Sequence, residues 1–202
     1  ATFDKSIISY YINGAKVTTL TSGLLSLTSN NFDLAIGGPN SDIENNTGFN
    51  FYGDLDDIKI YNRPITEPEV LQLYNESAST CTNSGPVASY PFCGNANDVS
   101  GNNYNGTIVG ATLTADRFGN ANSAYYFDGN VNSNGTNQPD RINLGINPEL
   151  KFTGSQMAIS CWINPAGANF TSGRIVLGGR VNDSYTLVLE NDRVLWRPIL
   201  IG

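Results

Sequence analysis

The sequence contains no histidine among its 202 residues. Imidazole is the usual general acid or base near neutral pH, and it belongs to Ser-His-Asp and Cys-His nucleophile arrangements and to most catalytic zinc sites. Such arrangements are therefore excluded within the chain. The three cysteines, Cys81, Cys93 and Cys161, lack C-x-x-C spacing, which argues against a zinc ribbon and a thioredoxin-type motif.

Charged residues are also scarce, at 14% of the sequence. Asn, Ser, Thr and Gly must supply most of the polar surface, and they favour turns and short strands over helices, so we expect an all-β fold. The net charge is −7, and the 11 basic residues form no stripe. Because such a surface repels phosphate backbones, nucleic acid is not an expected partner.

Long hydrophobic runs are missing as well. No apolar stretch approaches the roughly 20 residues of a membrane span, so we expect no membrane insertion. Short alternating stretches take their place, and residues 6–20 predict a hairpin with a tight turn at Asn13-Gly14. Further strands are predicted at residues 32–36, 51–61, 88–92, 107–114, 123–127, 141–144, 157–163, 174–177, 184–189 and 193–201.

One short helix is predicted after residue 65. Thr66 can cap its amino end, Pro68 suits its first turn, and Val70, Leu71 and Leu73 follow at helical spacing. The next stretch is rich in Ser, Thr, Asn, Gly and Pro, and we place a linker at residues 80–86. Both ends of the sequence read as strands, which predicts that it is a slice of a longer polypeptide.

A family resemblance rests on two long motifs. Residues 51–66 read F-Y-G-D-L-D-D-I-K-I-Y-N-R-P-I-T, and Glu69-Val70 and Leu73-Tyr74 follow. This stretch resembles the closing segment of laminin G-like, concanavalin-type jelly-roll domains. Residues 1–4 and 11–14 are similar to the mid-domain hairpin of that family, although the Trp-His-His stretch that normally precedes it is not present. Residues 1–79 therefore resemble the C-terminal half of such a domain.

The opening segment of the same family is found later in the chain. Six short stretches resemble it: residues 88–92, 94–98, 100–103, 105–107, 116–121 and 126–129. Residues 159–163 are similar to the first central strand of the family. Residues 87–202 thus resemble an N-terminal half. The resemblance implies an antiparallel β-sandwich with one short helix, and we expect Tyr90, Phe92, Phe127 and Trp162 in its core, with Ile58 and Ile60 facing inward.

This order, tail before head, allows three architectures. In a slice through a tandem array, neighbouring repeats complete each half; in a circular permutant the halves complete each other; in an assembling subunit, identical chains complete them. We favour the tandem slice, because repeat arrays draw their ends from neighbours. Neither half should be stable alone, since an incomplete sandwich exposes unpaired edges and an apolar sheet face.

Calcium is the cofactor to consider first, because acidic, Asn-rich loops supply the oxygen ligands that it prefers. Asp98 lies in such a loop with Asn95 and Asn97, near a region where the family often holds structural calcium. The competing interpretation is a self-bonded Asx turn. Asp56 and Asp57 are adjacent, so in a strand only one can face the site, and we predict that Asp56 joins Asp98.

Catalysis is not expected. The Glu-x-Asp-x-x-Glu strand motif of jelly-roll glycosidases is absent. Glycan binding instead requires an exposed aromatic ring among polar neighbours, for which Tyr52, Tyr104 and Trp196 are the candidates. A disulfide between Cys81 and Cys93 would close a short loop and pin the linker to a sheet, leaving Cys161 as a buried thiol.

These features together predict a non-catalytic repeat module of a large secreted or cell-surface protein. It would serve adhesion or extracellular filament building and recognise cell-surface or environmental glycans. The alternative is an accessory carbohydrate-binding module of a polysaccharide-degrading enzyme. Either function places the protein outside the cell or on its surface.

Overall fold

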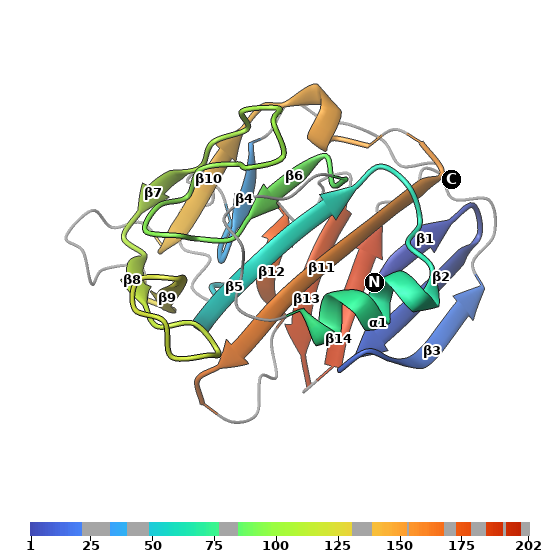
Figure 1. Cartoon of the computed structure of the whole chain (residues 1–202), viewed down its shortest axis with the longest axis horizontal. Coiled ribbons are helices and arrows are strands. Elements are labelled where there is room, and N and C mark those ends of the chain that lie inside the picture. Colours follow the sequence, from blue (N-terminus) through green and yellow to red (C-terminus); the bar gives the residue numbers. More distant parts are fainter. Residues whose placement is uncertain are drawn as a thin grey trace.

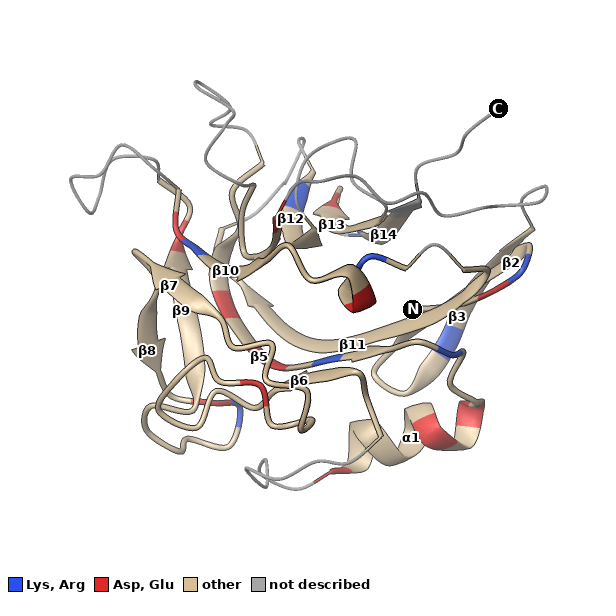
Figure 2. Ribbon diagram, turned by 90° about the horizontal axis from the view of Figure 1, so that it is seen from above, with Lys and Arg blue, Asp and Glu red and all other residues tan. Residues whose placement is uncertain are grey.

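The computed structural model describes residues 1–21, 33–39, 49–76, 85–130, 139–152, 154–167, 173–178, 185–191 and 193–198. Two antiparallel sheets face each other, and one helix lies on the outer side of the first sheet (Figures 1 and 2). The prediction of an all-β sandwich with one short helix is confirmed. No helix in the described part of the chain has the length and apolar character needed to cross a membrane.

Counted over the described residues, the first sheet has eight strands. In spatial order they are β3 (Ala15–Thr21), β2 (Ile7–Ile12), β1 (Thr2–Asp4), β11 (Gln156–Pro165), β5 (Tyr52–Tyr61), β9 (Ala124–Asp128) and β8 (Thr112–Thr114), and β6 (Ala88–Tyr90) pairs with β5 beside β9. The second sheet has six. They run β14 (Arg193–Pro198), β13 (Tyr185–Glu190), β12 (Arg174–Gly178), β4 (Leu34–Ile36), β10 (Arg141–Gly145) and β7 (Thr107–Val109).

Strands from the two predicted halves alternate in both sheets. In the first sheet β11, from the second half, lies between β1 and β5 from the first. In the second sheet β4, from the first half, lies between β12 and β10. The halves therefore complete each other within this chain, whereas we had favoured completion by neighbouring repeats. The physical reason is that each half supplies a strand, β4 or β11, that pairs on both edges with strands of the other half. The tandem array stays a prediction, and residues 77–84, most of the predicted linker, lie outside the described residues.

The core lies between the sheets. Its largest fully buried side chains include Tyr90, Phe92 and Phe127, as predicted, and Ile58 and Ile60 face inward. The prediction that Trp162 lies in the core was wrong. Trp162 is half-buried and stacks on Tyr74 of the helix, with ring centroids 5.7 Å apart, so it lies on the outer face. Its neighbours Cys161 and Ile163 take the inward positions instead, because side chains alternate along β11.

Helix α1 (Glu67–Asn75) begins where the sequence predicts. Thr66 accepts a hydrogen bond from the Glu69 amide, and the Glu69 carboxylate accepts one from the Thr66 amide at 2.7 Å, which forms a capping box. The Arg63 guanidinium 2.7 Å away, together with the Thr66 donors, lowers the pKa of Glu69 to about 2. Val70 and Ile65 pack with Tyr61 on the outer face of the first sheet. The helix therefore covers part of the sheet opposite the main core.

One local feature departs from the predicted strands. The single strand predicted at residues 107–114 is two, because the chain turns at Gly110, whose φ is +79°, and passes from the second sheet to the first. The hairpin prediction is confirmed, with Asn13 and Gly14 both at positive φ between β2 and β3.

Candidate functional site

The loop around Asp98 is held together by its own hydrogen bonds. The Asp98 carboxylate accepts four, from the Ser89 amide at 2.9 Å, the Ser100 amide at 2.9 Å, the Ser100 hydroxyl at 2.8 Å and the Tyr104 amide at 3.1 Å. Asp98 is only 8% exposed, whereas Asn95 and Asn97 are exposed and bond within the same turn. The carboxylate thus fastens the loop to β6, as the Asx-turn interpretation holds.

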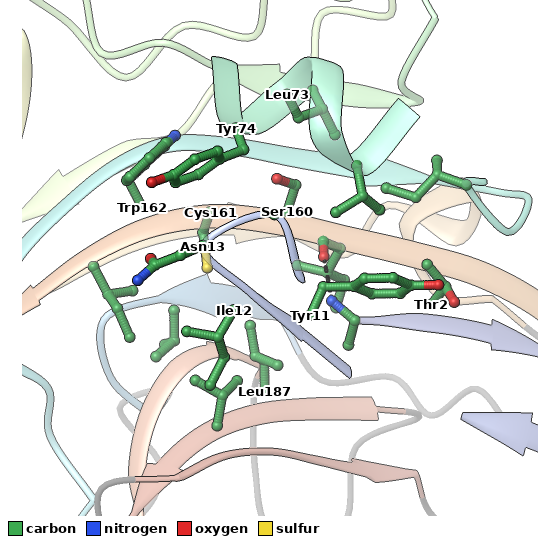
Figure 3. Close-up of a pocket in the computed structure, with 18 of the residues that line it drawn as sticks. Thr2, Tyr11, Ile12, Asn13, Leu73, Tyr74, Ser160, Cys161, Trp162 and Leu187 are labelled. Carbon is green, nitrogen blue, oxygen red and sulfur yellow. Dashed lines mark hydrogen bonds between the residues drawn. The ribbon is translucent and has the colours of Figure 1, made fainter. Parts of the chain in front are cut away.

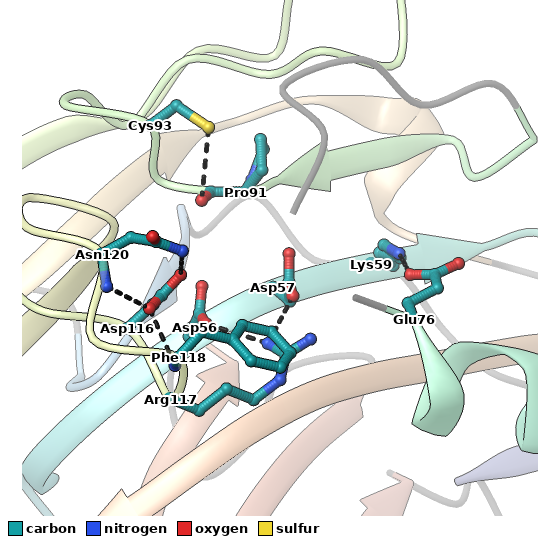
Figure 4. A network of polar contacts seen from close by, with 10 residues as sticks. All are labelled: Asp56, Asp57, Lys59, Glu76, Pro91, Cys93, Asp116, Arg117, Phe118 and Asn120. Atoms are coloured by element: carbon teal, nitrogen blue, oxygen red, sulfur yellow. Dashed lines mark hydrogen bonds and ion pairs between the residues drawn. The ribbon is translucent and has the colours of Figure 1, made fainter. Parts of the chain in front are cut away.

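Asp56 contacts a different partner. Nη1 of Arg117, in the loop between β8 and β9, donates to Oδ2 of Asp56 at 3.0 Å and to Oδ2 of Asp57 at 2.6 Å (Figure 4). The expectation that these two adjacent carboxylates face opposite sides of the sheet is wrong. A β-bulge sets Asp57 and Ile58 opposite the single residue Cys161, and Asp57 has a φ of +49°. The bulge turns both carboxylates outward and keeps Ile58 in the core.

Aromatic rings cover this ion cluster. The Arg117 guanidinium lies 4.1 Å from the Trp162 ring centroid and 4.4 Å from that of Phe118. The pKa of Asp56 is raised to about 7, first by burial and then by the neighbouring Asp57 carboxylate, while the Arg117 charge opposes the shift. Because Asp56 and Asp57 come from the first half and Arg117 from the second, the cluster locks the two halves together.

The predicted calcium ligands are therefore engaged with protein groups. Asp98 is bonded within its loop and Asp56 to Arg117. Within the described ranges, no group of three or more acidic or cysteine side chains is arranged to hold a metal ion. Calcium stays a prediction that this geometry does not support.

Of the three aromatic candidates for ligand binding, two are parts of the scaffold. Trp196 is 5% exposed and packs edge-to-face on Phe3, with ring centroids 5.0 Å apart, so its prediction as an exposed ligand platform was wrong. Tyr104 is half-buried against the core, and its carbonyl accepts the Tyr90 hydroxyl at 2.7 Å. Tyr52, the third, is 39% exposed.

Tyr52 borders a polar cavity of about 340 Å³ at the end of β5 and β9. Its ring meets that of Tyr126 edge-to-face, with centroids 6.2 Å apart, and the hydrogen bond between the two tyrosine side chains raises the pKa of Tyr126. Asp128, Gly129, Asn130 and Arg174 complete the lining. A Cβ on Gly129 would come within 2.9 Å of Cβ of Tyr52, so this position requires the small residue.

Polar contacts fix the rim of this cavity. Oδ1 of Asp128 accepts the Asn130 amide at 2.8 Å, and the Asp128 amide is held by Asp140 at 2.9 Å. Arg174 Nη1 donates to the Asn50 carbonyl at 3.3 Å. The cavity thus combines two tyrosine rings with an acid, an amide and a guanidinium. The sequence signals only Tyr52, because the other groups come from strands far apart in the chain.

A family model described as the concanavalin A-like lectin/glucanase superfamily matches residues 1–71. Residues 1–71 are thus similar to this superfamily. The resemblance to laminin G-like domains is thereby confirmed. No curated protein and no solved structure matches the chain significantly.

The similarity of residues 1–71 to concanavalin A-like domains supports a carbohydrate-binding or adhesion-type module in general terms. Laminin G-like lectin-type domains are generally non-catalytic, although the superfamily includes glucanases. The adjacent carboxylates Asp56 and Asp57 are unsuited to glycoside cleavage, because their side chains are 7% and 5% exposed and bonded to Arg117. A substrate has no access to them.

The cysteines divide into two kinds. Cys93 is disulfide-bonded, whereas Cys161 on β11 carries a free thiol. Cys81, the predicted partner of Cys93, lies outside the described residues. Burial raises the pKa of the Cys161 thiol to about 11, so the thiol is protonated at neutral pH.

Proposed function

We propose that the chain is a non-catalytic, glycan-binding adhesion module of a secreted or cell-surface protein, and that glycans bind at the cavity bordered by Tyr52 and Tyr126. The observation that carries the proposal is this cavity on a concanavalin A-like sandwich, with an exposed tyrosine ring beside polar groups. Sugar rings present C–H faces that pack on aromatic rings and hydroxyls that bond to carboxylate, amide and guanidinium groups.

Different groups in the cavity suit the apolar faces and the hydroxyls of a saccharide. Tyr52 presents its ring to solvent while Tyr126, held edge-to-face behind it, fixes the ring orientation. Asp128 and Asn130 offer acceptors and a donor in the lining, and Arg174 adds a guanidinium. About 340 Å³ fits one or two sugar residues, at the low end of ligand pockets.

The test is a glycan array followed by titration of the strongest ligand with matched tyrosine variants. Tyr52→Ala should weaken binding at least about 10-fold, equivalent to about 1.4 kcal/mol. Tyr74→Ala is the control, because Tyr74 is 40% exposed, close to the 39% of Tyr52, yet lies on the helix away from the cavity. Circular dichroism checks that both variants are folded.

Two results would refute the proposal. Equal loss of affinity in both variants would mean that the glycan does not bind at this cavity. An array on which no glycan binds would refute glycan binding as the function. The same preparation should release no reducing ends from the polysaccharide that it binds. Measurable turnover would make the chain part of a polysaccharide-degrading enzyme instead.

A further inference from the structure

Two cavities of similar size differ in the ligands that they offer. One, of about 360 Å³, is lined by residues of β2, α1, β11 and the second sheet, among them Ile12 and Leu187 (Figure 3). None of the described residues that line it is acidic. The polar cavity beside Tyr52 has Asp128 in its lining, and a second acid, Asp140, is bonded to Asp128. Because hard cations prefer oxygen ligands, the surroundings of the second cavity suit a metal ion better.

Asp128 and Asp140 hold the turn at the end of β9 with one oxygen each. Oδ2 of Asp140 accepts the Asp128 amide at 2.9 Å, and Oδ1 of Asp128 accepts the Asn130 amide at 2.8 Å. The two carboxylates also lie within hydrogen-bonding reach of each other. Asp140 is 4% exposed, so this contact brings two like charges together largely out of water.

No cation in the described part of the chain compensates these two charges. The salt bridges found there do not include Asp128 or Asp140. Burial and the Asp128 carboxylate raise the pKa of Asp140, and the Asp128 amide, not an arginine, opposes the shift. The pair formed by Asp56 and Asp57 differs in this respect, because Arg117 bonds to both acids. One acid pair thus has a cation of its own and the other does not.

Two buried oxygens beside the same turn lack a hydrogen-bond donor within the described ranges. They are Oδ1 of Asp140 and Oδ1 of Asn50. Asn50 is 1% exposed, and its Nδ2 donates to the Gly129 carbonyl at 3.4 Å, which places its amide group at the turn. A buried acceptor without a donor costs free energy, so these two atoms indicate a missing partner.

We propose that this turn binds a calcium ion through Oδ1 of Asp140, the carboxylate of Asp128 and Oδ1 of Asn50. Calcium takes about six to eight oxygen ligands, and water from the adjacent cavity of about 340 Å³ would complete the set. The site is separate from the pair of Asp56 and Asp98 that the sequence predicts. It does not depend on glycan binding.

A cation satisfies this arrangement better than a shared proton or a water molecule does. A proton between Asp128 and Asp140 would leave Oδ1 of Asn50 without a donor. A water molecule that donates to both orphan oxygens would leave the two negative charges uncompensated. A divalent ion bonds to all three side chains and neutralises both acids.

The test measures the binding of calcium chloride alone to the 202-residue chain after metals are removed with EDTA. Isothermal titration calorimetry gives the stoichiometry and the affinity, and thermal unfolding is followed with calcium and in EDTA. Asp140→Asn is the test variant, because asparagine keeps an oxygen for the Asp128 amide but removes one charge. Asp56→Asn is the matched control, because it neutralises a buried acid of the pair that Arg117 already compensates.

We expect one calcium ion per chain with a Kd of about 0.1–1 mM, as in extracellular calcium modules. The melting temperature should rise by about 3–10 °C at about 10 mM calcium chloride. Asp140→Asn should weaken binding at least about 10-fold and yet melt no lower than the parent in EDTA, since it removes a repulsion. Asp56→Asn should bind calcium as the parent does. Sodium chloride at the same ionic strength should produce no comparable rise.

Absence of calcium binding by the parent chain would overturn the proposal and leave a proton or water at the turn. So would unweakened binding by Asp140→Asn, or a lower melting temperature of this variant in EDTA. Loss of binding in Asp56→Asn would place the ion at the other acid pair, and an equal rise with sodium chloride would show charge screening without a site. Either result overturns the proposal. Because the metal is the only ligand added, a failure of glycan binding leaves these results unaffected.

Discussion

Replacing Arg117 with methionine should lower the free energy of unfolding by removing the ion pairs that join the two halves of the sandwich. Met keeps an unbranched apolar side chain at this position, but it removes the guanidinium that contacts the Trp162 and Phe118 rings. Asp56 and Asp57 are then left as two buried carboxylates whose Oδ2 atoms both lay within 3.0 Å of the same nitrogen. Removing the guanidinium thus leaves the two negatively charged carboxylates buried without their cation.

The magnitude follows from burial. Breaking a buried ion pair by removing one partner costs about 3–5 kcal/mol, and the 17% exposure of the Arg117 side chain places the expected loss near the lower end. A loss of about 3 kcal/mol corresponds to a fall of about 6–12 °C in melting temperature for a chain of this length. Neutralising one acid, as in Arg117→Met with Asp56→Asn, should restore about half of the loss.

The loss should depend on pH in a definite direction. The folded pKa of Asp56, about 7, lies above its unfolded value of 3.8. Its contribution to stability is therefore complete below about pH 4 and is lost as the pH rises through 7. Arg117 is the charge that lowers this pKa, so its removal raises the pKa further. The variant should consequently be much less stable than the parent at pH 8 and close to it at pH 5.

Urea unfolding at pH 5, 6.5 and 8, followed by tryptophan fluorescence, measures these free energies directly. Three outcomes would refute the reasoning: a loss below about 1 kcal/mol at pH 8, a loss that is the same at pH 5, or no rescue by Asp56→Asn. The first would mean that the ion cluster contributes little, and the others that the loss arises from packing alone.

Three further predictions concern single groups. Acetylation of the Ala1 amino group should stabilise the protein by about 2 kcal/mol at pH 6 and much less at pH 9, because the folded pKa of about 6 lies below 8.0 and the unfolded state binds the proton more readily between them; an equal gain at both values would contradict this in chemical denaturation. Gly37→Ala should lower the melting temperature strongly, since φ is +84° and a Cβ would meet the Phe127 ring at 2.2 Å; an unchanged melting temperature would show that the ring yields. Thr66→Ala should cost about 1 kcal/mol through the lost helix cap, whereas Thr66→Ser should cost much less.

The sequence alone predicted the elements whose causes are local. The capping box of Thr66 and Glu69, the Asn13-Gly14 turn and the alternation along β5 and β11 depend on residues only a few positions apart. The family resemblance of residues 1–71 was also readable, because it rests on a contiguous motif. These features establish the sandwich and its helix, as well as Tyr52 as a candidate for ligand binding.

Only the tertiary structure decided which groups meet. A single bulge at Asp57 reverses the facing that strict alternation predicts, and it brings both acids to Arg117, some 60 residues away. The same kind of non-local placement puts Trp196 in the core and Trp162 outside, and it gathers Tyr126, Asp128 and Arg174 around Tyr52. Strand order decides these contacts, because pairing joins segments that the sequence separates, and local chemistry carries no information about which segments will be neighbours.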